Sequence, residues 1–300
     1  MTKRILLIIL FFCSVCLGQW SGVKPPLGTQ LDRSHPLGNP VAAYFMLEGG
    51  GSKIYDLSGN GNTGSFVGNT AWVPGKFGSC LSFDGVGDYI ASAATPTLKI
   101  VEGTLSVWAK TSVPGLYLLT VGSGGNRVFI TMTGGGAIRG QALIGWSTIF
   151  QINTPTGALH DGKWHHSVLT WNSSEAVFYV DGRREISESG DERWNNTANV
   201  AAQIGADGSG TTNWNGSIDN VMIFNRALTA SEIVQLYREP FCMFQQETPW
   251  LYVTAAAEEE ETQVIMVATI ARYSPFVILI GLAYICTRRQ LGRERRYGKK

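Results

Sequence analysis

Short runs of alternating apolar and polar residues, divided by turn signals, fill the middle of this 300-residue chain. In one run Leu105, Val107 and Ala109 alternate with polar or bulky neighbours. A period of two places successive side chains on opposite faces of a strand, so each run fits a strand with one face in a core. Comparable runs lie at 41–47, 64–67, 79–84, 88–92, 116–121, 127–133, 148–153, 168–171, 176–180, 203–205 and 214–224.

Glycine punctuates these runs and is the most over-represented residue, at 36 of 300. Asn-Gly or Asp-Gly pairs, which favour tight hairpin turns, occur at 60–61, 84–85, 161–162, 181–182 and 207–208. A charged fraction of only 16% argues against a coiled coil, and the aromatic fraction of 11% argues against a disordered chain. The pattern predicts an all-β fold, a two-sheet antiparallel sandwich.

One helix is expected after the last strand. Thr229 and Glu232 have the spacing of a capping box, in which each side chain bonds the other residue's backbone N–H. Leu228 and Ile233 occupy the positions of a hydrophobic staple, and Pro240 follows the helix.

The N-terminus has the layout of a secretory signal. Lys3 and Arg4 precede an apolar run too short for a membrane span, and small residues lead to a cleavage point after Gly18. We therefore expect a signal peptide over 1–18. Residues 19–39 are rich in proline and glycine without an apolar period, and we interpret them as a linker.

A second apolar stretch at 264–286 is long enough to span a bilayer as a separate C-terminal membrane helix. Arg272 lies inside it, near enough to one end to snorkel outwards. Residues 287–300 carry seven basic side chains against one acidic one, which the positive-inside rule predicts for a cytoplasmic tail. With a short acidic stalk at 240–263, the expected topology is an exported body and a cytoplasmic C-terminus.

The body between the two ends is acidic. Residues 19–263 hold 14 Lys and Arg against 22 Asp and Glu. Because phosphate binding needs a basic face, this balance argues against a nucleic-acid partner.

Four motifs, in order along the chain, resemble a laminin-G-like jelly-roll domain of the concanavalin A-like, pentraxin-like group over residues 40–239. They are Asp56-Leu-Ser-Gly-Asn-Gly-Asn62, Val73-Pro-Gly-Lys-Phe-Gly-Ser-Cys-Leu-Ser-Phe-Asp-Gly85 with Asp88-Tyr89, Asp161-Gly-Lys-Trp-His-His166 with Phe178-Tyr-Val-Asp-Gly182, and Gly216–Val221 with Phe224–Thr229. The resemblance implies a binding or adhesive module, often for glycans. Together with the expected export signal, we predict a non-catalytic extracellular recognition module. Its expected partner is a glycan or a surface protein, and calcium assists binding in some members.

Two sets of residues are candidates for that recognition. Trp146, Trp194 and Trp214 stand in polar, glycine- or asparagine-rich surroundings, which suits rings that stack on sugars. Asp84, Asp88, Asp207 and Asp219 flank strand ends, where loop carboxylates could bind calcium. Aspartate before glycine is also a common turn cap, so the sequence leaves both interpretations open. A structural or adhesive module that binds no sugar is the alternative function.

The sequence gives weaker support for an enzyme active site or a metal site. A glycosidase needs two carboxylates across a cleft, and the closest set, Glu185, Glu188, Asp191 and Glu192, lies in a segment that we interpret as a solvated loop. His165 and His166 are neighbours on a strand and point to opposite faces, so they cannot chelate one ion. The glycine run at 59–64 matches a dinucleotide fingerprint in letters but is followed by a strand pattern rather than a helix.

Two cysteines remain in the exported body. Cys80 and Cys242 could form a disulfide, which an oxidising compartment permits, or remain two buried thiols, the interpretation we prefer.

Overall fold

The computed structural model describes residues 22–155, 159–196 and 198–245, with the short stretches 251–254 and 266–269. These belong to two units, which divide after Gln245. In the second unit β17 (Leu251–Thr254) and β18 (Met266–Thr269) pair antiparallel.

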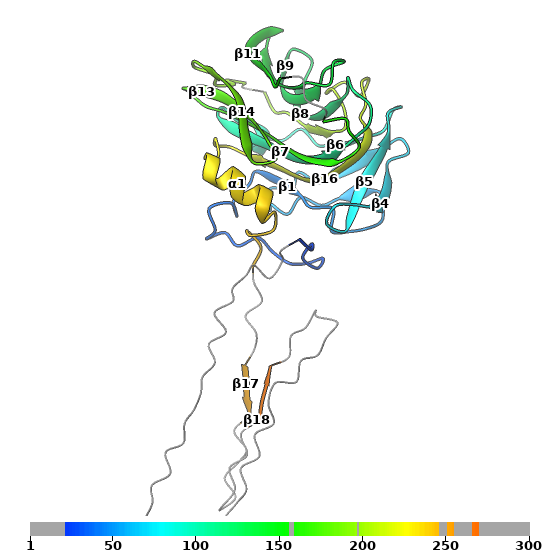
Figure 1. The fold of residues 1–300 in the computed structure, drawn as a ribbon, viewed down its shortest axis with the longest axis vertical. Coiled ribbons are helices and arrows are strands. Elements are labelled where there is room, and N and C mark those ends of the chain that lie inside the picture. The colour runs from blue at the N-terminus through cyan, green and yellow to red at the C-terminus, as the bar shows by residue number, and fades with distance from the viewer. Residues whose placement is uncertain (1–21, 156–158, 197, 246–250, 255–265, 270–300) are drawn as a thin grey trace, which may run out of the picture. The chain divides into compact units, whose positions relative to one another are not determined.

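The first unit is a sandwich of two eight-stranded antiparallel sheets (Figure 1). The first sheet runs β14 (Arg183–Ser189), β13 (Glu175–Val180), β12 (Trp164–Trp171), β7 (Gly103–Lys110), β16 (Asn215–Phe224), β5 (Ser79–Asp84) and β4 (Ala71–Pro74), with β1 (Ala42–Tyr44) also paired to β16. The second runs β11 (Ser147–Asn153), β10 (Ile138–Ile144), β9 (Asn126–Met132), β8 (Tyr117–Ser123), β15 (Ala202–Ile204), β6 (Tyr89–Ser92), β3 (Gly64–Val67) and β2 (Lys53–Ile54). The predicted two-sheet sandwich is confirmed.

The main core lies between the two sheets, where their inward positions meet. Leu105 and Val107 of β7 and Val128 and Ile130 of β9 are fully buried in it. These residues recur at every second position, which is the period the sequence displays. The alternation therefore follows directly from one buried face per strand.

A second core covers the outer face of the first sheet, so strands such as β7 are buried on both sides. Met222 and Phe224 of β16 contribute to it from the sheet, and Ile233 and Leu236 contribute from α1 (Ala230–Arg238). The helix lies on the side of β7 and β16 that faces away from β8 and β9 (Figure 1).

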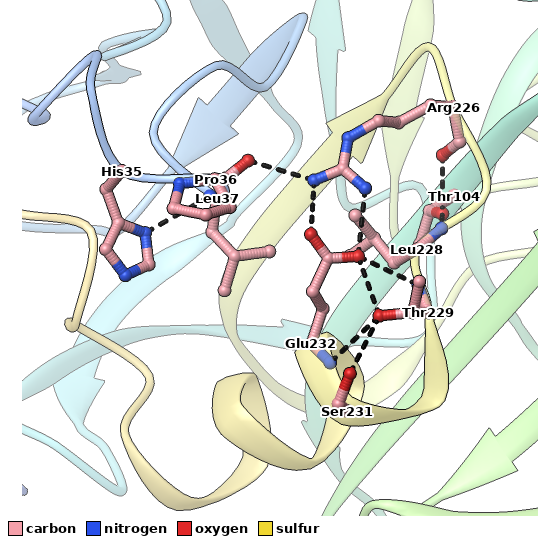
Figure 2. Close-up of polar contacts among 9 residues, drawn as sticks. All are labelled: His35, Pro36, Leu37, Thr104, Arg226, Leu228, Thr229, Ser231 and Glu232. Carbon is pink, nitrogen blue, oxygen red and sulfur yellow. Dashed lines mark hydrogen bonds and ion pairs between the residues drawn. The ribbon is translucent and has the colours of Figure 1, made fainter.

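The N-terminus of α1 has the predicted capping box. Thr229 accepts the backbone N–H of Glu232 at 3.3 Å, and the Glu232 carboxylate accepts the backbone N–H of Thr229 at 2.9 Å. Arg226 adds a bidentate ion pair with Glu232 (Figure 2). Its two N–O distances are 2.6 and 2.9 Å. The same guanidinium donates to the carbonyl of Pro36, so the helix start is tied to the N-terminal segment.

The segment expected as a linker packs against the sandwich over its described part, residues 22–39. Leu31 and Leu37 are buried in the second core, and Leu31 forms a bridge with Phe244. The expected stalk also begins later than predicted, because Phe241 and Phe244 are buried in the same core. Both segments lack a helical or strand period, so their few apolar residues gave no sequence signal of burial.

The interpretation of residues 185–192 as a solvated loop is wrong for most of that segment. Residues 183–189 form β14, an edge strand whose side chains are almost all exposed. An edge strand with no buried face shows no apolar alternation, and charged side chains there discourage edge-to-edge pairing.

Neither predicted targeting segment is tested by the described residues. Residues 1–18 and 287–300 lie outside them, and 264–286 is described only at 266–269, as β18. Among the residues that the structure does describe, no helix has the length and apolar character to cross a bilayer.

Candidate functional site

Trp146 lies in the tight turn that joins β10 to β11. Ile144 pairs with Ser147, which leaves Gly145 and Trp146 as a two-residue turn with φ of 56° and 70°. Two positive φ values match the twist of a hairpin, but a tryptophan in this region costs roughly 1–2 kcal/mol. Strain retained at an exposed residue is an observation that points towards function.

The neighbouring hairpin holds this turn in place. The backbone N–H of Trp146 donates to the carbonyl of Gly125 at 3.1 Å, and the N–H of Gly145 donates to the side chain of Asn126 at 2.9 Å. Gly125 lies in the turn between β8 and β9, and Asn126 is the first residue of β9, so hydrogen bonds join the tips of two hairpins.

The indole of Trp146 rests on glycine. A Cβ at Gly125 would come within 2.8 Å of the ring, and one at Gly124 would lie 3.8 Å from it. Because these two glycines have no side chain, the indole can lie directly on their backbone, while 73% of Trp146 stays exposed. A large aromatic surface held by its backbone and open to solvent is suited to stacking on an apolar sugar face.

The side chain of Arg127 on β9 contacts two aromatic rings, one from β8 and one from β9. Val128 and Ile130 of β9 face the core between the sheets. The alternate residues Arg127 and Phe129 therefore lie on the outer face of the second sheet. The guanidinium lies over the Phe129 ring at 5.0 Å and over the Tyr117 ring at 5.5 Å. These cation–π contacts fix the arginine across the outer face of the second sheet.

The loop between β15 and β16 folds over this face. Thr120 donates its hydroxyl to the carbonyl of Ala206 at 2.7 Å, and Gln203 bonds Gly208 with both side-chain atoms at 3.1 Å. Arg127 donates to the carbonyl of Asp207. We call Tyr117, Arg127, Phe129, Trp146 and the loop 206–213 the Trp146 surface.

The charge of this surface is distinctive within an acidic body. Strands β8, β9, β10 and β11 contain no Asp or Glu, whereas β9 and β10 contribute Arg127 and Arg139. The two facing carboxylates of a glycosidase are therefore not formed on these strands. On these strands aromatic, guanidinium and backbone groups remain, which bind hydroxyl and carboxylate groups. The loop 206–213 adds the carboxylate of Asp207, which accepts hydrogen bonds from its own turn.

The other two candidate tryptophans do not join the Trp146 surface. Trp194 and Trp214 are 0% and 1% exposed, and both fill the core between the sheets. The indole N–H of Trp194 donates to the carbonyl of Leu143 at 2.9 Å. The expectation that these rings are open to a ligand is wrong: their polar sequence neighbours are turn residues, and the rings point inwards.

Nearby turn donors occupy the carboxylates of two of the four candidate calcium ligands, Asp207 and Asp88. Asp207 accepts four groups of Ser209 and Thr211, at 2.8–3.1 Å, in a loop-closing turn. Asp88 accepts the backbone N–H groups of Asn69 and Asp84.

Position also separates the four aspartates. Asp84, Asp88 and Asp207 lie at one end of the sandwich, where Gly87 donates to Asn213, whereas Asp219 is buried within β16 beside Lys24. No group of three or more acidic, histidine or cysteine side chains is gathered for a metal within the described parts of the chain. The donors favour turn caps over a calcium shell.

The two histidines point to opposite sides of β12, as expected. His165 bonds Asp181 at 2.8 Å and Asp161 at 3.2 Å, and the bond to Asp181 raises its pKa. His166 is fully buried, stacks on Trp108 and meets Ser106 at 2.8 Å. Burial lowers the pKa of His166 to about 3, so the ring is neutral.

Both cysteines are free thiols, as we preferred. Cys80 is buried and Cys242 is half-buried, and burial raises their pKa values to about 11 and 12. The glycine run at 59–64 is a turn around Asp56, whose carboxylate accepts the N–H groups of Ala43, Ser58 and Asn62, and it leads into β3.

A hollow of about 420 Å³ lies between α1 and the turn from β13 to β14. Asp181, Arg183, Glu185 and Arg238 line it together with Tyr237. Binding pockets are mostly apolar with a few polar groups, whereas half of the eight residues that line this hollow are charged. The hollow is therefore a weaker candidate than the Trp146 surface.

The two packed antiparallel sheets are those of a lectin- or glucanase-type sandwich. The family profile described as the concanavalin A-like lectin/glucanases superfamily matches residues 84–234, and the chain belongs to this family. The resemblance of the four sequence motifs is thereby confirmed. No curated protein sequence matches the chain.

Solved structures share the fold at low sequence identity. The binding domain of Paraclostridial Mosquitocidal Protein 1 is 18% identical, with a TM-score of 0.54 over 68% of this chain and 52% of that one. Domain 4 of the arabinanase AbnA from Geobacillus stearothermophilus, solved with arabinotriose, is 18% identical, with a TM-score of 0.53 over 66% of this chain and 98% of that one.

An enzyme also contains this fold. Trypanosoma rangeli sialidase is 22% identical, with a TM-score of 0.53 over 68% of this chain and 33% of that one. The chain thus spans about half the length of the mosquitocidal binding domain and a third of the sialidase. The fold occurs in binding domains and in glycosidases alike.

Proposed function

We propose that this chain is a non-catalytic glycan-recognition module that binds sugar at the Trp146 surface. The observation that carries the proposal is Trp146 itself, a strained and 73% exposed indole that is held on two glycines. A ring with one supported side offers its other side to a sugar ring at little cost in side-chain entropy.

Arg127 provides the polar half of the proposed site. Its guanidinium is held by two rings and by the Asp207 carbonyl, so little further ordering is needed when a ligand arrives. The half-buried Tyr117 ring beside it adds aromatic area, whereas Phe129 is buried and supports the guanidinium from below. The arabinotriose-bound neighbour supports a sugar ligand, because its sandwich has the same fold.

The test is a glycan array with the full chain, followed by titration of the best ligand, with arabinotriose as a first single probe. We expect Trp146→Ala to weaken binding at least tenfold. Val86→Ala is the matched control, since Val86 is 77% exposed on a loop at the same end of the sandwich. Equal affinity of Trp146→Ala and wild type would overturn the proposal.

A protein partner is the other outcome of the same experiment. A neighbour of this fold, the binding domain of botulinum neurotoxin DC, was solved with rat synaptotagmin II, at 14% identity. If no glycan binds, and a protein partner is retained by wild type but lost by Trp146→Ala, the surface serves protein recognition or adhesion instead.

We also propose that the module is exported and anchored, with its body outside the membrane and its tail in the cytoplasm. The basic-apolar N-terminus, the apolar residues 264–286 and the basic residues beyond them support this topology. Alkaline carbonate extraction of membranes tests it. Recovery of the full-length chain in the supernatant would contradict the anchor.

A further inference from the structure

A buried ammonium fills a gap in the first sheet. β16 pairs with β5 up to Ile218 and with β1 from Val221 onwards, and the register shifts between these two regions. Asp219 and Asn220 lie in the gap, and Asn220 has a φ of 42°. The Lys24 side chain enters there from the N-terminal segment and brings Nζ to 2.5 Å from Oδ1 of Asp219.

Both partners are removed from solvent. The Lys24 side chain is 7% exposed and that of Asp219 is 0% exposed. Charges buried in this way lose their hydration, and the attraction between them often fails to offset that loss. Burial accordingly lowers the pKa of Lys24 and raises the pKa of Asp219 to about 6, so both shifts favour a neutral amine beside a protonated acid.

The surroundings orient the nitrogen. Besides Asp219, Lys24 Nζ donates to the carbonyl of Ser79 and, at 3.5 Å, to the carbonyl of Met46. Once one proton has passed to the carboxylate, the two remaining N–H bonds stay on these carbonyls. The lone pair of the nitrogen then points at the acid.

The carboxyl group is held in a complementary way. Oδ1 of Asp219 accepts the backbone N–H of Asn220 at 2.9 Å, whereas Oδ2 has no hydrogen-bond partner among the described residues. One oxygen is thus polarised as a carbonyl would be, and the other is free to leave. Such a donor stabilises negative charge that develops on the retained oxygen.

A second carboxyl group, that of Glu48, completes the cluster. Glu48 acts electrostatically on Lys24, and its Oε2 is buried without a partner in the described structure, while Oε1 accepts the N–H of Tyr55 at 2.7 Å. An unpaired carboxylate oxygen near the reacting pair can accept a proton from nitrogen and return it to oxygen.

We propose that Lys24 and Asp219 join spontaneously in an intramolecular amide bond, with Glu48 as the proton relay. Nζ forms a bond to Cγ of Asp219, and the bond from Cγ to Oδ2 breaks. Two protons of the ammonium leave with Oδ2 as one water molecule, so the ion pair becomes a neutral amide without any other reactant. The remaining N–H stays on the Ser79 carbonyl.

The product would fasten the N-terminal segment to the central strand across a sequence separation of 195 residues. A cross-link that closes so long a loop removes much conformational freedom from the unfolded chain. This suits a module that is pulled between a bound ligand and its own attachment.

Mass spectrometry of the purified full chain tests the proposal. We expect wild type to be lighter than its processed sequence by one water molecule. A tryptic digest should contain Lys24 and Asp219 in one branched peptide. Lys24→Arg keeps the charge but lacks the nucleophile, so this variant should have the full mass. Lys76→Arg is the matched control, because the Nζ of Lys76 lies over the Trp108 ring. This control should remain lighter by one water molecule.

Two results would overturn the cross-link. One is a folded wild type of full mass with Lys24 and Asp219 in separate peptides. The other is a water loss that persists in Lys24→Arg, which would assign it to cyclisation at an aspartate. Glu48→Gln should slow the conversion at least tenfold, and an unchanged rate would exclude Glu48 as the relay. The peptide map of wild type decides the matter even if a variant does not fold.

Discussion

The indole of Trp146 lies against Gly125, at a position where a Cβ would come within 2.8 Å of the ring. The two residues are also joined through their backbones, since the Trp146 N–H donates to the Gly125 carbonyl. The exposed ring of the proposed site thus depends on a residue of another hairpin.

The first prediction follows from this contact. Gly125→Ala should displace the Trp146 ring and weaken glycan binding by tenfold or more, because the new methyl group occupies the place of the indole. Gly134→Ala is the control, since a Cβ there meets nothing within 4 Å. Titration and thermal melting of both variants check it; equal affinities would show that the ring does not need its glycine support.

The second prediction concerns the cap of α1. Thr229→Ala removes the acceptor of the Glu232 N–H and should lower the free energy of unfolding by about 0.5–2 kcal/mol. Thr229→Ser keeps the hydroxyl and should retain most of that stability. Urea titration measures both, and a loss of equal size in the serine variant would assign the effect to the lost methyl group instead.

The third prediction concerns the pH dependence that His165 and His166 impose with opposite signs. The pKa of His165 is raised, mainly by its hydrogen bond to Asp181, so its stabilisation is complete below the ordinary histidine value of about 6.5 and is lost as pH rises through the folded pKa. The pKa of His166 is lowered to about 3 by burial, so stability falls as the pH drops below about 6.5, where only the unfolded chain takes up that proton.

Unfolding free energies measured across this range separate the two effects. His165→Gln should flatten the loss on the alkaline side and leave the loss on the acid side in place. If the variant keeps the wild-type slope on the alkaline side, another group carries it.

The fourth prediction concerns calcium. Because turn donors already satisfy Asp207, melting curves in millimolar calcium and in chelator should overlap. Asp207→Ala leaves Ser209 and Thr211 without their acceptor and should destabilise the chain by about 1–3 kcal/mol in either buffer. A calcium-dependent rise in melting temperature that disappears in this variant would restore the metal site.

The sequence predicts the strands of the main core well and the candidate site poorly. β10, which leads into Trp146, was not predicted, because Gly140 takes an inward position without an apolar side chain. Arg127 and Tyr117 carried no signal either, since a lone arginine and a lone tyrosine on strands look like ordinary surface residues. Only the pairing of β8, β9 and β10 places Arg127 across from Leu143, three residues before Trp146, and brings the Tyr117 ring to Arg127.

The three candidate tryptophans show that sequence neighbours do not predict whether a ring is exposed. Each has glycine, asparagine or other polar neighbours in the sequence, yet Trp146 is 73% exposed while Trp194 and Trp214 are at most 1% exposed. Flanking residues report the local turn, whereas burial depends on which distant strand faces the ring. Composition around a tryptophan therefore does not distinguish a binding platform from a core filler.

By itself the sequence determined the class of fold, the strand pattern of the main core and the capped helix, because alternation, turn chemistry and capping act between residues close together in the chain. Tertiary structure alone decided that β7 is buried on both faces, that residues 22–39 belong to the sandwich, and that Lys24 meets Asp219. Those outcomes depend on contacts between segments far apart in the chain. Their energy comes from burial that no local pattern records.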